Sequence, residues 1–130
     1  MNLDIKLNRL QLTQNIQTDY SYFNSVAYKV FSDFLVYAKI TSCITEIVQL
    51  GNILFSYESN PDSSDMIQYY QQLLNSTSEC ITESNNVISQ IPKDNPDGNN
   101  FKIILQALIV NCEQIQAIIP TTKQAKGGLK

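Results

Sequence analysis

Residues 20–48 read YSYFNSVAYKVFSDFLVYAKITSCITEIV, and apolar or small side chains recur along them at alternating steps of three and four residues. Eight steps over 28 residues give a period of 3.5, which is typical of helices that wind around neighbouring helices in bundles and coiled coils. The pattern predicts one long helix over about 19–57, either continuous or bent or broken near 39–42 or at Gly51. The members of the series are Tyr20, Phe23, Ala27, Val30, Phe34, Tyr37, Ile44 and Val48, with Thr41 filling the one gap.

A polar line runs along the opposite side of the same stretch and should face solvent. Its members are Ser25, Lys29, Ser32, Lys39, Ser42, Glu46 and Gln49.

Two further helices follow. Asn60 or Ser63 can cap the second long helix, and Pro61 suits its first turn. This helix carries apolar residues on one face and amides on the other until Pro92 ends it.

Residues 92–100 contain two prolines and an Asp-Gly pair, which predicts a turn. Asn99 or Asn100 can then cap a last helix over 101–119, which stops at Pro120. That helix is apolar around most of its circumference, so it should have neighbours on several sides.

The N-terminal residues fit a short helix better than a strand, because Leu3, Leu7 and Leu10 share one helical face and no partner strand is evident. Residues 121–130 hold three lysines and no acid, which predicts a flexible basic tail. The sequence therefore predicts an all-α fold. We expect a single antiparallel helical bundle over 1–120, with four helices, or five if the long helix breaks.

The predicted helices differ in length, at about 39, 27 and 19 residues. At 1.5 Å per residue the first would extend roughly 30 Å beyond the last. Either the long helix breaks and folds back, or another copy of the chain covers its surplus apolar surface. Both alternatives stay open, and a homo-oligomer is favoured.

The composition excludes much of enzyme chemistry. The 130 residues contain no His, so the commonest general base and metal ligand is missing. Cys43, Cys80 and Cys112 lie 37 and 32 residues apart, which is not zinc-ligand spacing. We therefore expect that the protein is not an enzyme and that it binds no metal ion and no cofactor. The cysteines should be buried free thiols, with a Cys80–Cys112 disulfide between packed helices as the alternative.

Charge is unevenly distributed. Residues 10–92 hold two lysines and eight acids, a net charge of −6, whereas the whole chain has −3. An acidic body repels phosphate backbones, so we expect no nucleic-acid partner. A basic protein is a partner that such a surface accommodates more easily. The two most apolar windows, 35–55 and 101–119, are interrupted by charged or amide side chains, and residues 1–6 lack an apolar run. We therefore expect no membrane span and a cytoplasmic protein.

Seven tyrosines occur in a chain without Trp, and Tyr is enriched at interfaces. The rings either lie at the edge of the bundle or form a partner-docking patch. The candidate patch consists of Tyr20, Tyr22, Val36, Tyr69 and Tyr70.

These observations favour a non-enzymatic protein–protein interaction module of the adaptor, inhibitor or immunity, or chaperone type. One alternative is a structural or assembly subunit that homo-oligomerises through the long helix. A binder of a small apolar ligand between helices is a further alternative.

Overall fold

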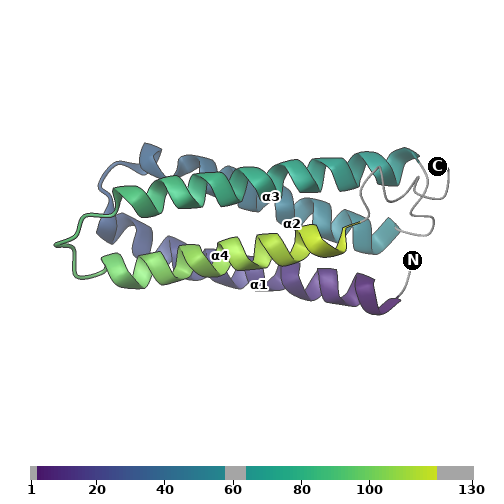
Figure 1. Ribbon diagram of the computed structural model, residues 1–130, viewed down its shortest axis with the longest axis horizontal. Coiled ribbons are helices and arrows are strands. Elements are labelled where there is room, and N and C mark those ends of the chain that lie inside the picture. The colour runs from purple at the N-terminus through teal and green to yellow at the C-terminus, as the bar shows by residue number, and fades with distance from the viewer. Residues whose placement is uncertain (1–2, 58–63, 120–130) are drawn as a thin grey trace.

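The computed structural model describes residues 3–57 and 64–119, and these two segments are helical with short connections. Their elements are α1 (Leu3–Val30), the 3-10 turn η1 (Phe34–Val36), α2 (Ala38–Tyr57), α3 (Ser64–Gln90) and α4 (Gly98–Ile118). Figure 1 shows the four long helices side by side, with successive helices running in opposite directions. The predicted all-α antiparallel bundle is confirmed, and the described residues form four helices, not five.

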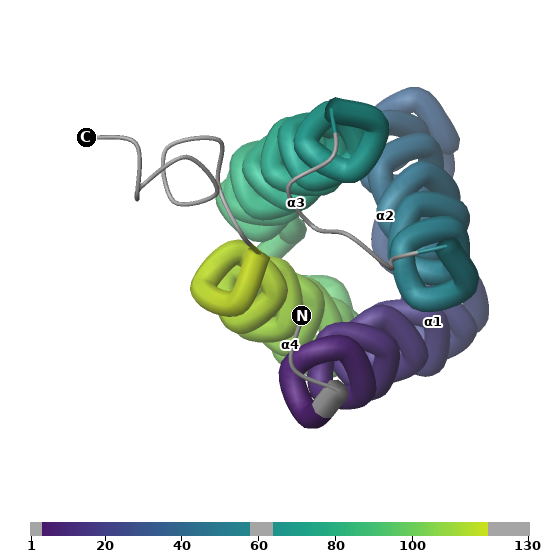
Figure 2. Tube along the Cα trace, turned by 90° about the vertical axis from the view of Figure 1, so that its right-hand side faces the viewer, coloured from purple at the N-terminus to yellow at the C-terminus, as the bar shows by residue number. Residues whose placement is uncertain are grey.

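Seen along its axis, the bundle places one helix at each corner of a square (Figure 2). Each helix packs against the helix before or after it in the chain, and α1 also packs against α4 to close the square. Short loops between antiparallel neighbours produce this up-down-up-down order.

The prediction of a single continuous helix over 19–57 is wrong. The chain leaves the helix after Val30 and re-enters one at Ala38, so the break lies ahead of the two positions expected for it. Ser32 and Asp33 interrupt the apolar run here, and the Asp33 carboxylate accepts a hydrogen bond from the Leu35 amide at 2.9 Å. A short side chain that bonds to the local backbone competes with the helix at such a point. The short N-terminal helix is continuous with the first half of the predicted long one, so the number of helices remains four.

Gly51 does not break α2 but allows α2 to approach α1 closely. A Cβ atom at Gly51 would lie 2.5 Å from Thr13 Oγ1 and 2.7 Å from Thr13 Cγ2. Distances this short leave no room for a side chain. Gly51 is therefore a point of close approach between these two helices.

The turn between α3 and α4 is organised by Asn95. The Asn95 amide donates to the Lys29 carbonyl of α1 at 3.0 Å, and its side-chain oxygen accepts from the Asp97 amide at 2.8 Å. The sequence prediction that Asn99 or Asn100 caps α4 is wrong, because the helix begins at Gly98 with Asp97 in the cap position. Asn60, Pro61, Ser63 and the tail 121–130 lie outside the described residues.

The core contains an aromatic cluster at the end of the bundle where α1 ends. The Phe23 ring lies 5.5 Å from the Tyr37 ring and 5.3 Å from the Phe101 ring, between centroids. Aliphatic side chains from all four helices fill the remainder. Cys43, Cys80 and Cys112 are all buried free thiols, as the sequence predicted.

Candidate functional site

The five residues of the predicted patch lie on different parts of the surface. Tyr20 is half-buried between α1 and α2, whereas Tyr22 is 60% exposed on the outer side of α1. Val36 sits half-buried in η1 against the core. Tyr69 is half-buried on α3 beside α2. Tyr70 is only 1% exposed, and the Arg9 guanidinium lies 5.8 Å from its ring centroid.

Two of these residues retain a place at a candidate site. Tyr20 and Tyr69 flank α2 on opposite sides, and Gln49 of α2 lies beside both. Tyr70 cannot contact a partner because its ring is in the core. Val36 does not share a side with Tyr22, because the helix that would have aligned them is broken between them.

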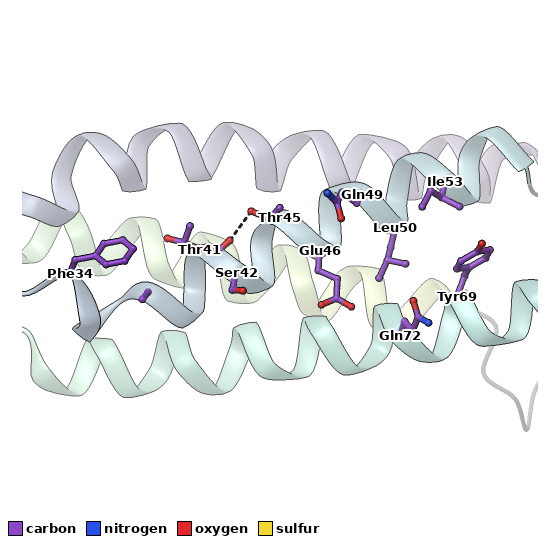
Figure 3. Close-up of a pocket in the computed structure, with 11 residues that line it drawn as sticks. Phe34, Thr41, Ser42, Thr45, Glu46, Gln49, Leu50, Ile53, Tyr69 and Gln72 are labelled. Carbon is purple, nitrogen blue, oxygen red and sulfur yellow. Dashed lines mark hydrogen bonds between the residues drawn. The ribbon is translucent and has the colours of Figure 1, made fainter.

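An open groove with a volume of about 710 Å³ runs along α2 (Figure 3). Phe34 of η1 lies at one end, and Ile53 of α2 with Tyr69 of α3 lies at the other. Between them most of the lining is polar, with Ala38 and Leu50 as apolar members, and the polar residues are Thr41, Ser42, Thr45, Glu46, Gln49 and Gln72. Three residues of the polar line that the sequence assigned to solvent, Ser42, Glu46 and Gln49, thus line the groove.

The burial of Phe34 was predicted wrongly from the sequence. The 3.5-residue pattern put it in the core, but its side chain is 55% exposed. Its ring packs edge-on against Tyr37 at 5.4 Å between centroids, and its other side faces the groove. The Ser32-Asp33 pair just before Phe34 could have indicated its exposure. This pair begins a new element, which turns the Phe34 side chain outward.

Carboxylates lie along the seam between α2 and α3. Glu46 is exposed, and Figure 3 shows its side chain directed from α2 toward α3. Glu79 of α3 hydrogen-bonds to Cys43, and its negative charge acts on the same thiol. The lining of the groove thus carries one carboxylate, that of Glu46, between two ends with aromatic and aliphatic side chains.

Two of the three buried thiols, Cys43 and Cys112, have raised pKa values, whereas the hydrogen bond with Cys112 lowers the pKa of Cys80. Burial, with the nearby Glu79 carboxylate, raises the pKa of the Cys43 thiol to about 12. A hydrogen bond to Cys80, together with burial, raises the pKa of the Cys112 thiol. Because the thiolate is the nucleophile and the metal ligand, thiols that stay protonated at neutral pH are inert.

The described residues contain no group of three or more His, Cys, Asp or Glu side chains placed to hold a metal ion. One helix, α4, is long and apolar enough to cross a membrane by length and composition alone. Its inward face, which includes Phe101, Leu105 and Leu108, is buried in the bundle.

Comparisons with known proteins found no matching family model, no matching curated protein and no matching solved structure. The function therefore has to be inferred from the chemistry of the groove and of the surrounding surface.

Proposed function

We propose that the chain is a non-enzymatic protein–protein interaction module whose α2–α3 groove binds an amphipathic helical segment of a basic partner protein. The observation that carries this proposal is the order of side chains along the groove. Exposed Phe34 lies at one end, Tyr69 at the other, and Glu46 between them. Grooves that bind helices use apolar pockets as anchors, and charged groups beside them select the partner.

The length of the groove suits a short helix. Its α2 lining runs from Ala38 to Ile53, and the 15 steps between these residues span roughly 22 Å at 1.5 Å per residue. A partner helix of similar length would place one apolar side chain beside Phe34 and another beside Tyr69. A Lys or Arg near its middle would then lie opposite Glu46.

The chemistry of the chain supports binding over catalysis. The sequence has no His, and burial keeps Cys43 protonated at neutral pH. The groove is open and polar along its middle, which favours a peptide over a small apolar ligand. Three buried free thiols also fit a reducing compartment such as the cytoplasm.

Affinity capture from the native host tests the proposal. The immobilised chain should retain a basic protein, and a peptide from the helical region of that protein should bind the isolated chain. Glu46→Lys should weaken the binding of the peptide by about tenfold or more, because it reverses the charge opposite the basic side chain. Phe34→Ser combined with Tyr69→Ser should remove binding at both ends of the groove.

Tyr22→Ser provides the matched control, because Tyr22 is exposed on α1 outside the groove. This variant should bind the peptide as the natural chain does. Each variant is first checked by circular dichroism and thermal unfolding for a retained fold. If the groove variants bind as tightly as the natural chain, or if Tyr22→Ser alone abolishes binding, the groove is not the binding site.

A further inference from the structure

The outer face of α4 carries an apolar stripe that the proposed function does not use. Ile103 is 63% exposed and Val110 is 50% exposed, and the two are seven residues apart on one side of the helix. Ala117 continues the stripe after another seven residues and is also exposed, while Ala107 is half-buried beside it. Large apolar side chains aligned on a helix surface mark a contact surface.

The bundle leaves this stripe open. The sequence predicts that α4, being apolar around most of its circumference, has neighbours on several sides. In the structure α4 packs against α1 and α3, and its buried residues, such as Leu105 and Cys112, lie on the inward face. A seven-residue repeat is the spacing of a coiled-coil seam, and the small side chains of Ala107 and Ala117 allow another helix to come close.

Charges beside the stripe indicate what covers it. Lys102 and Glu113 are both exposed, and they are eleven residues apart. Eleven residues are close to three turns, so both lie on the same flank of the stripe, about 16 Å apart along the axis. A helix that packs antiparallel on the stripe and carries the same two residues would therefore place Lys beside Glu at both ends.

We propose that a second copy of this chain packs antiparallel on the outer face of α4. The two-fold axis lies midway between Ile103 and Val110, so Ile103 of each copy contacts Val110 of the other. Lys102 of each copy then lies near Glu113 of the other, about 3 Å apart along the helix axis at 1.5 Å per residue. In a parallel pairing the two Lys102 side chains would lie on opposite sides of the seam, and so would the two Glu113 side chains, so no contact between Lys102 and Glu113 would form.

A membrane suits this face less well than a second copy does. Exposed Gln106 and Glu113 border the stripe, Gln114 interrupts it between Val110 and Ala117, and a carboxylate beside it opposes anionic lipids. The seam is also short, so the dimer should be weak and its population should depend on protein concentration. It uses a different face from the α2–α3 groove, so the two proposals can fail independently.

Sedimentation equilibrium on the full chain tests the dimer. Between about 10 μM and 500 μM, where weak association is measurable, the mass should rise from 14.7 kDa toward twice that value. Ile103→Ser combined with Val110→Ser should keep the chain a monomer throughout. Tyr22→Ser should dimerise as the natural chain does, and circular dichroism should be the same for all three.

Charge exchange then tests the antiparallel pairing. Lys102→Glu and Glu113→Lys should each weaken the dimer by about tenfold, because each places like charges together twice. A chain carrying both substitutions should dimerise again, and an equimolar mixture of the two single variants should form a mixed dimer. Recovery in the mixture requires that the charges meet between copies.

Other results would overturn the proposal. These are a monomer at every concentration, a dimer unaffected by the serine substitutions, or a dimer whose stability does not respond to the charge exchange. Flotation with anionic vesicles tests the alternative that this face binds a membrane. If the natural chain stays monomeric and floats with vesicles while the double serine variant does not, the face binds lipid and not a second copy.

Discussion

At the scale of single residues, one glycine and one carboxylate are critical for how α1 packs. Gly51 of α2 lies against Thr13, with no space for a Cβ atom between them. Asp19 of α1 accepts a hydrogen bond from the Asn111 amide of α4 at 2.8 Å in a partly buried position. Both contacts join segments that are far apart in sequence, and both can be tested by substitution.

Gly51→Ala should lower the free energy of unfolding by about 1–2 kcal/mol. Overpacking costs about 1–3 kcal/mol, and the better helix propensity of Ala returns up to about 1 kcal/mol. Adding Thr13→Ala removes the two atoms that the new methyl group meets, so the double variant should recover part of the loss. Urea denaturation of the four chains in this cycle measures the coupling between the two sites.

Asn52→Ala is the matched control, because Asn52 is the next residue and is exposed. It should be neutral or slightly stabilising. A Gly51→Ala variant as stable as the natural chain would contradict the close approach of α1 and α2.

The raised pKa of the Asp19 carboxyl predicts a specific dependence of stability on pH. Burial raises the pKa of its carboxyl above the ordinary 3.8, and the hydrogen bond from Asn111 offsets this in part. A raised pKa in the folded state means that the contribution of Asp19 is fully present below the unfolded pKa and is lost as pH rises through the folded pKa.

Asp19→Asn removes this titration and keeps an oxygen that can accept from Asn111. The stability of the variant relative to the natural chain should therefore increase as pH rises from about 3 to 7, and then level off. Urea denaturation at a series of pH values measures it. A constant difference between the two chains, or one that falls with pH, would show that Asp19 does not titrate in this way.

At the scale of elements, the reversals of the chain determine the fold. Asp33 begins η1 and ends the long apolar run of residues 20–48. Asn95 ties the α3–α4 turn to the last turn of α1 through the Lys29 carbonyl. The last carbonyls of a helix have no partner within the helix, so this bond satisfies one of them.

Asn95→Ala should destabilise the protein by about 1–2 kcal/mol, because it removes two side-chain hydrogen bonds of about 0.5–1.5 kcal/mol each. Asn99→Ala provides the comparison, since Asn99 is exposed and is one of the two residues that the sequence offered as a cap. It should change stability by less than about 0.5 kcal/mol. Thermal unfolding of both variants measures the difference, and equal effects would contradict the role of Asn95.

The elements also show how far the sequence alone can lead. Residues 64–90 and 98–118 are helical close to the predicted limits, because prolines and turn residues border them. The break at 31–37 was missed because Val30 and Tyr37 are both buried on either side of it. The 3.5-residue series thus continues across a reversal of the chain.

The candidate site was harder to predict than the fold. Tyr69 of the predicted patch lines the groove, but the other wall comes from Phe34 and α2. Phe34 turns outward only because η1 reverses the chain, and Tyr70 is buried where the patch required it exposed. Such differences in exposure depend on how the helices pack against one another. The spacing of apolar residues along one helix carries no information about that packing.

At the scale of the whole molecule, the bundle presents two separate surfaces. The α2–α3 groove has apolar ends with Glu46 between them, whereas α4 exposes Ile103 and Val110 on its outer face. Phe34 and Ile103 are exposed, so replacing them should affect association and leave the fold intact. Because the groove and the stripe lie on different elements, a dimer formed through α4 would present two grooves to partner proteins.

Site-specific crosslinking in the native host tests the central claim most directly. A photo-crosslinking amino acid at position 49, inside the groove, should join the chain to one basic protein through a helical segment of that protein. The same crosslinker at position 22, on the outer side of α1, should not capture that protein. If position 22 captures it as efficiently as position 49, or if position 49 captures no protein, the groove is not the surface through which this protein acts.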